Sequence, residues 1–302
     1  MAVARWLRAH ANRIEVCIMD MSTILGRLQD ARPSDESLFV LLDGALFPAM
    51  QSIYEYETSP QACPIYYGTR HETSLEVSPC LYEPRSESKI WECSENWRDK
   101  VVIFTSRYSF FDVLRHVQSL ISVSLSSGQL AYWRFYSPSW LASVMEVFEK
   151  EDLKNFTGPI NQWAAYTGNG WKLYRPPVSE DPIHSRDEGW LHLSDAYIET
   201  WKNGKRKSFI RQIEERADEE LGELSAESPL RDDISNLFDF AKGHGFQRAS
   251  ELERFIFLCL KYPDVMNSAE YRVIIEDIGR PPMERLDKLE SALFGIREEE
   301  SA

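Results

Sequence analysis

The sequence predicts an α+β protein, with an α/β-like N-terminal lobe built on a small mixed sheet and an all-helical C-terminal lobe. Two short apolar runs in the first half, Leu38–Leu42 and Val101–Phe104, are typical of buried strands and alternate with helical patterns. From Trp190 onward the hydrophobic spacing is helical and contains no convincing strand pattern. These observations indicate two lobes of different construction.

The stretch 110–147 is predicted to be the packing centre of the first lobe, because a helix, a hairpin and a second helix follow one another without long loops. Apolar residues recur at helical spacing from Phe110 to Ile121. Ser109 and Asp112 stand in the relation of a capping box, which marks the start of this helix.

The hairpin is expected to consist of strands 122–125 and 130–135 around a Ser-Ser-Gly-Gln turn. Alternation along the second strand directs Trp133 toward the core and Arg134 to the opposite face. Ser137 then provides an N-cap for the second helix, with proline in the first helical position.

Four parts of the chain follow from these patterns. They are an amphipathic helical extension (1–35), the α/β lobe (36–175), a linker (176–189) and the helical lobe (190–302). The linker holds three prolines and several charges. The helical lobe is expected to contain about five helices. The first helical region of this lobe is expected to be interrupted near Asn203.

The net charge bears on possible partners. The 302 residues carry a formal net charge of -14, which argues against nucleic acid or an anionic membrane surface as the main partner. Most of this charge lies after residue 179, where 28 acidic and 17 basic side chains are present. We therefore expect an acidic helical lobe that is able to meet a basic segment of a partner.

Cysteine usage and hydropathy bear on localisation. The five cysteines lack CxxC spacing, which favours a reducing cytoplasm over a disulfide framework or a zinc site. No apolar run reaches the ~18–20 residues needed to cross a membrane. The basic N-terminus lacks the uninterrupted apolar segment of a signal peptide. We expect a cytoplasmic protein without membrane insertion.

Motifs for metal, nucleotide or acyl chemistry are incomplete. His71-Glu72 begins like a zinc-binding HExxH motif, but Leu75 occupies the position of the second histidine. The sequence has no GxSxG elbow and no phosphate-binding GxxxxGK[ST] loop. We therefore expect no catalytic residue, no metal and no cofactor.

One enzyme alternative remains at Asp43. The strand that ends in Asp43-Gly44 resembles the first motif of haloacid-dehalogenase-type phosphatases, and Thr105-Ser106 after the next apolar strand resembles their second motif. In that family the strand ends in DxDG, and the first aspartate is the nucleophile. Leu41 occupies that position here, and Asp-Gly after a strand is also ordinary turn chemistry.

Six short segments follow one another along the chain: LLDGAL (41–46), YYGT (66–69), SPCL (78–81), LRHVQSLISV (114–123), YWRFYSPSWL (132–141) and FTGPI (156–160). Their succession resembles a known family, the type VI secretion adaptor chaperones called Tap or Tec. The resemblance covers roughly residues 38–160 and implies a non-enzymatic protein of the Gram-negative cytoplasm. Such an adaptor binds a toxic effector and helps load it onto the VgrG spike protein.

One departure from the family pattern is informative. Family members commonly have Asp-Pro after the RFY strand, whereas this chain has Ser137-Pro138. Serine and aspartate are both good N-caps, but serine does not replace aspartate as a general base or metal ligand. We therefore expect a structural role at this position.

The candidate partner-binding residues lie around the predicted hairpin. Arginine and aromatic side chains are the types that most often dominate protein interfaces. The candidates are Arg115, Arg134, Tyr136 and Trp140.

A further alternative to an adaptor is an interaction module of another system, such as a scaffold or an immunity-like inhibitor. Such a module has the same expected fold.

Overall fold

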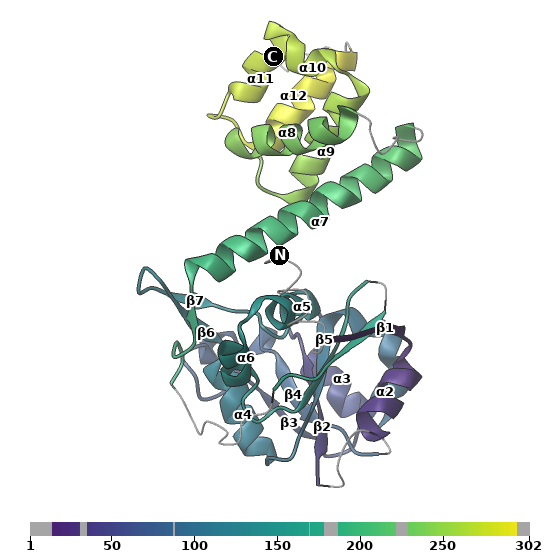
Figure 1. Ribbon diagram of the computed structural model, residues 1–302, viewed down its shortest axis with the longest axis vertical. Coiled ribbons are helices and arrows are strands. Elements are labelled where there is room, and N and C mark those ends of the chain that lie inside the picture. The colour runs from purple at the N-terminus through teal and green to yellow at the C-terminus, as the bar shows by residue number, and fades with distance from the viewer. Residues whose placement is uncertain are drawn as a thin grey trace, which may run out of the picture. The chain divides into compact units, whose positions relative to one another are not determined.

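The computed structural model describes residues 14–30, 35–86, 88–168, 170–177, 187–221 and 229–294. The chain falls into two compact units, Met1–Trp201 and Lys202–Ala302 (Figure 1). The first is a mixed α/β unit and the second is helical, so the predicted fold class is confirmed. Among the described residues, no helix combines the length and apolar character that a membrane span requires.

A seven-stranded sheet in the order β1-β9-β8-β5-β2-β4-β3 forms the centre of the first unit. With seven strands it is larger than the small mixed sheet that the sequence predicts. Every neighbouring pair of strands in it is antiparallel. Its strands are β1 (Ile14–Met19), β2 (Ser37–Leu42), β3 (Gln61–Pro64), β4 (Cys80–Glu83), β5 (Val101–Ser106), β8 (Gln162–Tyr166) and β9 (Trp171–Tyr174).

The apolar runs of β2 and β5 are explained by burial on both faces of this sheet. In β2, Phe39 and Leu41 belong to one core cluster, whereas Val40 and Leu42 belong to another. The first cluster is covered by α4 (Phe110–Ser119), α5 (Pro138–Val147) and α6 (Lys150–Thr157). The second is covered by α2 (Met21–Asp30) and α3 (Ala49–Tyr56) (Figure 1). The 3-10 turn η2 (Lys89–Asn96) also contributes, through Ile90.

The predicted helical extension is wrong for residues 14–19, and residues 1–13 lie outside the described ranges. Strand β1 pairs with β9, from Ile14 opposite Tyr174 to Met19 opposite Trp171. The apolar spacing of this segment is compatible with a helix, but pairing with a strand more than 150 residues away decides its structure. Only the following segment, α2, is helical.

A second, three-stranded sheet contains the predicted hairpin. Strands β6 (Ser122–Leu125) and β7 (Leu130–Tyr132) are antiparallel, and β10 (His192–Leu193) pairs parallel with β6. Strand β7 ends at Tyr132 rather than at residue 135, because the chain turns there and Ser137 N–H donates to the carbonyl of Arg134 at 3.0 Å. The hairpin itself is confirmed.

The start of α4 is also confirmed. The hydroxyl of Ser109 accepts a hydrogen bond from the backbone N–H of Asp112 at 3.3 Å and donates to its carboxylate at 2.6 Å. The residue before α5, Ser137, makes no side-chain capping bond to the backbone.

The boundary between the units lies later than expected. Residues 190–201 were predicted to belong to the helical lobe, but Leu191, Leu193 and Trp201 belong to the core of the first unit. Helix α7 (Asp195–Leu221) continues through Gly204 without the predicted interruption. A glycine inside a helix costs only about 1 kcal/mol, so it does not end a long helix by itself.

The second unit contains helices packed around one apolar cluster. This cluster includes Ile213 of α7, Ile234 of α8, Phe255 of α9 and Leu286 of α12. The described helices after α7 are α8 (Pro229–Gly243), α9 (Ala249–Lys261), α10 (Asp264–Asn267), α11 (Ala269–Glu276) and α12 (Pro282–Phe294).

Candidate functional site

Asp43 directly follows β2, and its carboxylate anchors the loop that comes next. The residue is only 1% exposed. Its Oδ1 accepts a hydrogen bond from the backbone N–H of Ala45 at 3.1 Å, and its backbone carbonyl accepts bonds from the N–H groups of Leu46 and Phe47. Its Oδ2 forms an ion pair with Arg134, which follows β7. Both carboxylate oxygens are therefore engaged within the protein.

Gly44 lies against the backbone of the loop before β4. A Cβ atom at this position would come 1.9 Å from the carbonyl oxygen of Ser78, so the close approach requires glycine. The Ser78 hydroxyl accepts a hydrogen bond from the backbone N–H of Tyr66 at 3.0 Å and donates to the carbonyl of Pro79 at 2.9 Å. These contacts join loops that are far apart in the sequence.

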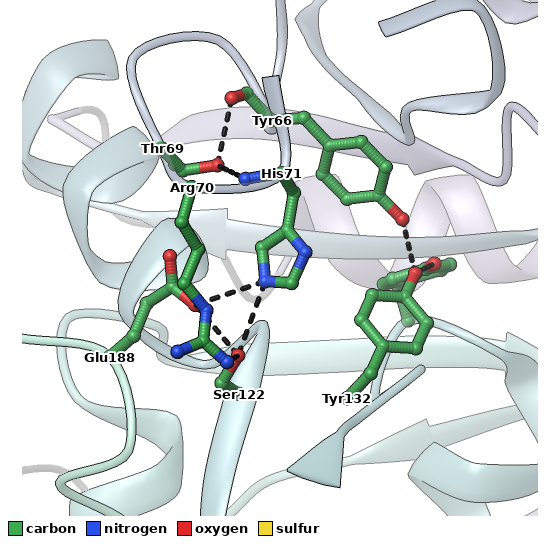
Figure 2. Close-up of polar contacts among 8 residues, drawn as sticks. Tyr66, Thr69, Arg70, His71, Ser122, Tyr132 and Glu188 are labelled. Atoms are coloured by element: carbon green, nitrogen blue, oxygen red, sulfur yellow. Dashed lines mark hydrogen bonds and ion pairs between the residues drawn. The ribbon is translucent and has the colours of Figure 1, made fainter. Parts of the chain in front are cut away.

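Three tyrosine hydroxyls form a hydrogen-bonded chain beside these loops. The hydroxyl of Tyr132 contacts those of Tyr66 and Tyr136, and Figure 2 shows the rings of Tyr66 and Tyr132 meeting through their oxygens. The guanidinium of Arg134 lies 6.0 Å from the centre of the Tyr136 ring. We call this set the Asp43 corner: Asp43, Tyr66, Ser78, Tyr132, Arg134 and Tyr136.

The surroundings shift the pKa values of three residues in the Asp43 corner, Tyr132, Arg134 and Tyr136. Burial raises the pKa of both Tyr132 and Tyr136, so the two phenols are protonated at neutral pH. Burial lowers the pKa of Arg134, but the hydrogen bond and charge of Asp43 outweigh this effect and the pKa is raised. Arg134 is therefore a permanent cation, and its side chain is 38% exposed.

A second polar group lies next to the Asp43 corner and is centred on His71 (Figure 2). The Nε2 atom of His71 lies 3.1 Å from Oε2 of Glu188 and 3.2 Å from Oγ of Ser122. Arg70 forms an ion pair with Glu188, its Nε lying 3.3 Å from Oε2, and donates to Ser122 Oγ at 3.2 Å. We call Arg70, His71, Ser122 and Glu188 the His71 cluster.

Aromatic contacts join the two groups. The ring centroid of His71 lies 5.6 Å from the centroid of Tyr66 and 5.6 Å from that of Tyr132. The corner and the cluster therefore form one continuous polar and aromatic region, to which Tyr132 and Arg70 contribute exposed side-chain surface.

The His71 cluster contains the residue types of a Ser–His–Glu triad, but its geometry is different. In a catalytic triad the serine and the carboxylate contact different nitrogens of the imidazole. Here both contact Nε2, and Ser122 also donates directly to Glu188 at 2.7 Å. Ser122 is fully buried. This geometry fits a fixed polar contact between chain segments better than acyl transfer.

The cluster fixes the segment that precedes β10 onto the hairpin. The backbone N–H of Gly189 donates to the carbonyl of Ser122 at 2.9 Å. The indole N–H of Trp190 donates to Ser119 Oγ at 3.0 Å. The end of the predicted linker is thus part of the folded first unit.

Residues 38–155 match one protein-family model. The family is described as a domain of unknown function (DUF4123), and the matched residues make up less than half of the chain. Comparison with curated proteins and with solved structures gives no match. The DUF4123 region contains the whole Asp43 corner and all of the His71 cluster except Glu188.

The segments that carry the family resemblance contact one another in the structure. The corner takes residues from four of them: 41–46, 66–69, 78–81 and 132–141. The segment 114–123 contacts the segment 66–69, because the side-chain amide of Gln118 donates to the carbonyl of Tyr67 at 2.8 Å. The same segment contacts 156–160, where His116 Nε2 lies 2.9 Å from the carbonyl oxygen of Phe156. Separate sequence motifs therefore form one packed region.

The structure brings together two of the four predicted partner-binding residues. Arg134 and Tyr136 are both in the Asp43 corner, but Tyr136 is buried, so its contribution there is to hold Tyr132. Trp133 is buried in the core, as predicted from strand alternation.

The other two candidates lie outside the Asp43 corner. Arg115 is an exposed residue of α4 whose Nη2 lies 2.8 Å from Oδ1 of Asp112, three positions earlier. Trp140 of α5 is half-buried and packs edge-to-face on Trp201, with 5.2 Å between ring centroids. Their roles in partner binding stay predictions.

The geometry does not assemble the phosphatase motifs. Strands β2 and β5 are antiparallel, with Leu42 opposite Val101 and Ser37 opposite Ser106. Asp43 and Thr105-Ser106 therefore lie at opposite ends of the strand pair, about 17 Å apart along five residues of strand. Within the described ranges, no group of three or more His, Cys, Asp or Glu side chains is arranged to hold a metal ion.

Sequence reasoning missed most of this region. The sequence motif around His71 suggests only a metal ligand, and Glu188 falls within the predicted linker. The contact between them joins residues 117 positions apart, and no local pattern reports such a contact. The one sequence feature that points to this site is the joint occurrence of the LLDGAL, YYGT, SPCL and YWRFY segments. None of these segments indicates the site by itself.

Proposed function

We propose that this protein is a non-enzymatic adaptor chaperone of a type VI secretion system. It binds a toxic effector protein in the bacterial cytoplasm and helps load it onto the VgrG spike protein. The main support is the match of residues 38–155 to DUF4123, a family associated with effector-loading adaptors of this system.

The surface around the Asp43 corner is the best candidate for effector binding. Leu46, in the loop anchored by Asp43, is 57% exposed, and Tyr132 is 45% exposed. Arg134 and Arg70 add partly exposed guanidinium groups. Tyrosine and arginine are enriched among residues that dominate binding energy, and an apolar neighbour adds buried area on association.

The contacts beneath this surface support binding with little rearrangement. Arg134 is held by Asp43, Tyr132 by two hydroxyls, and Arg70 by Glu188. A side chain that is already ordered loses less conformational entropy on binding. The mechanism that we propose is therefore recognition by a preorganised surface, without chemical conversion of the effector.

The experiment is an affinity pull-down of the tagged chain from its native cytoplasm, with mass spectrometry after a moderate salt wash. The proposal expects a toxin-like protein together with a spike component. The variant Leu46→Glu should reduce effector recovery at least about tenfold, because it places a charge in the interface core. The matched control is Tyr54→Glu on α3, which changes another exposed apolar residue, 61% exposed, in a different element.

Recovery of the chain alone, or with metabolic enzymes only, would refute the adaptor function. A stable partner without any spike component would favour the alternative of an interaction module from another system. An effector that binds equally well to wild type and Leu46→Glu would leave the adaptor function standing and refute the proposed surface.

A further inference from the structure

The second unit contains an open apolar groove of about 410 Å³ between α8 and the α9–α10 corner. Its buried floor includes Leu237 and Cys259, and its walls include the half-buried Phe240, Leu260 and Met266. Three exposed residues form the rim: Asn236 on α8, Pro263 directly before α10 and Asn267 at the end of α10.

The groove has the features of a receptor for a helix. One wall is formed by α8, the other by the C-terminal end of α9 together with α10, and Phe240, Leu260 and Met266 lie half-buried between them. A partner helix that inserts apolar side chains from one face would complete this packing. Methionine and phenylalanine in the walls suit this use, because flexible and planar side chains adapt to different anchors.

The net charge of the second unit, together with one exposed carboxylate next to the groove in sequence, indicates the polar face of that helix. Residues 202–302 hold 22 acidic and 16 basic side chains. Asp264 is exposed at the start of α10, between the rim residue Pro263 and the wall residue Met266. The nearby Lys261 is engaged, since its Nζ lies 2.9 Å from Oε2 of Glu220. A basic partner is therefore favoured, and a second copy of this acidic unit is disfavoured.

We propose that this groove binds a basic amphipathic helix of a partner protein. Large apolar residues on one face of the helix enter the groove, and lysine or arginine residues face Asp264. The inference does not depend on the adaptor function, because it concerns a different unit and is tested with defined peptides.

The test is NMR of the full chain labelled with ¹³C in the methionine methyl groups, with Met266→Leu used to assign the Met266 signal. The probe is an 18-residue synthetic peptide with leucine on one helical face and lysine on the other. We expect saturable shifts of the Met266 methyl and a Kd on the order of micromolar. A peptide with glutamate in place of lysine should bind at least about tenfold more weakly.

Matched variants locate the contact. Asn267→Trp places a large side chain at the rim and should raise the Kd at least about tenfold, whereas Glu270→Trp on the exposed side of α11 should leave it unchanged. Asp264→Lys should raise the Kd about three- to tenfold. An unaffected Met266 methyl, equal binding of the acidic peptide, or an unchanged Kd for Asn267→Trp would each overturn the proposal. So would a Met266 shift that depends on protein concentration alone, because the groove would then bind a second copy.

Discussion

Arg134 forms an ion pair with the buried carboxylate of Asp43, which lies 91 positions earlier in the chain. Removing only the guanidinium leaves a carboxylate without its cation in the interior. Because Arg134 is partly exposed, solvent screening reduces the cost, and we expect Arg134→Ala to lower the free energy of unfolding by about 1–3 kcal/mol. Urea denaturation followed by tryptophan fluorescence measures this change.

The matched comparison is the double variant Asp43→Asn with Arg134→Ala. Its loss of stability should be smaller than the sum of the two single losses, because the unpaired charge is absent. If the loss of unfolding free energy in the double variant equals the sum of the two single losses, Asp43 and Arg134 do not stabilise the protein through their interaction. Alanine at Arg134 or Tyr136 should lower stability as well as partner binding, because Asp43 and Tyr136 are buried.

The contact between Gly44 and Ser78 gives a second prediction. Gly44→Ala should destabilise the first unit by about 2–4 kcal/mol, because the new methyl group meets a backbone carbonyl that has little freedom to move. Gly26→Ala is the control, since a Cβ there meets nothing within 4 Å and the position is helical. That variant should gain about 0.5–1 kcal/mol. Equal effects in thermal unfolding would contradict the close approach at Gly44.

Acid should weaken the second unit through Glu251, which lies in the first turn of α9. Its Oε2 accepts hydrogen bonds from the backbone N–H groups of Gln247 and Arg248 at 2.9 and 3.0 Å. Burial alone would raise the pKa of Glu251, but these bonds lower it below the usual value for glutamate. The stabilisation is therefore present near neutral pH and is lost as the pH falls through this lowered pKa.

Glu251→Gln should cost about 1–2 kcal/mol at neutral pH and flatten the loss of stability between pH 5 and the lowered pKa. Urea denaturation at a series of pH values checks this slope. Glu276→Gln, at the exposed end of α11, is the control and should retain the slope of the wild type. An unchanged slope in Glu251→Gln would assign the acid sensitivity to other carboxylates.

The position of Asp43 predicts the result of a phosphatase assay. Both of its carboxylate oxygens are engaged, and the segment that resembles the second phosphatase motif lies at the other end of the strand pair. We expect the purified chain to release no phosphate from a generic aryl phosphate with Mg²⁺ above the rate of the Asp43→Asn variant. A Mg²⁺-dependent rate that disappears in Asp43→Asn would restore the enzyme alternative.

Elements with strong local signals were predictable from the sequence. The capping box at Ser109, the helix that it starts and the Ser-Ser-Gly-Gln turn are encoded within a few residues of each other. Strand β1 and the uninterrupted helix α7 were not predictable, because a distant pairing partner and the packing of a whole helix decide them. Local propensity is a weak prior where tertiary contacts disagree with it.

For the candidate site, the sequence identified Arg134 but not its environment. Strand alternation predicts that Arg134 lies on the face opposite Trp133, but the chain turns after Tyr132. Tyr136, which is a predicted partner-binding residue, is buried. The pairing of Arg134 with Asp43, and of His71 with Glu188, depends on how four loops come together. A single sequence contains no direct record of such contacts.

The order of the strands determines which fragments of this chain are able to fold. Strand β8 pairs with β5, and β9 follows β8, yet both lie beyond residue 155. A fragment limited to residues 38–155 would leave β5, an apolar and wholly buried strand, with one edge unpaired. Such an edge is a template for aggregation. The boundaries of the family match are therefore unsuitable as boundaries for expression, and an N-terminal fragment should extend at least to Trp201.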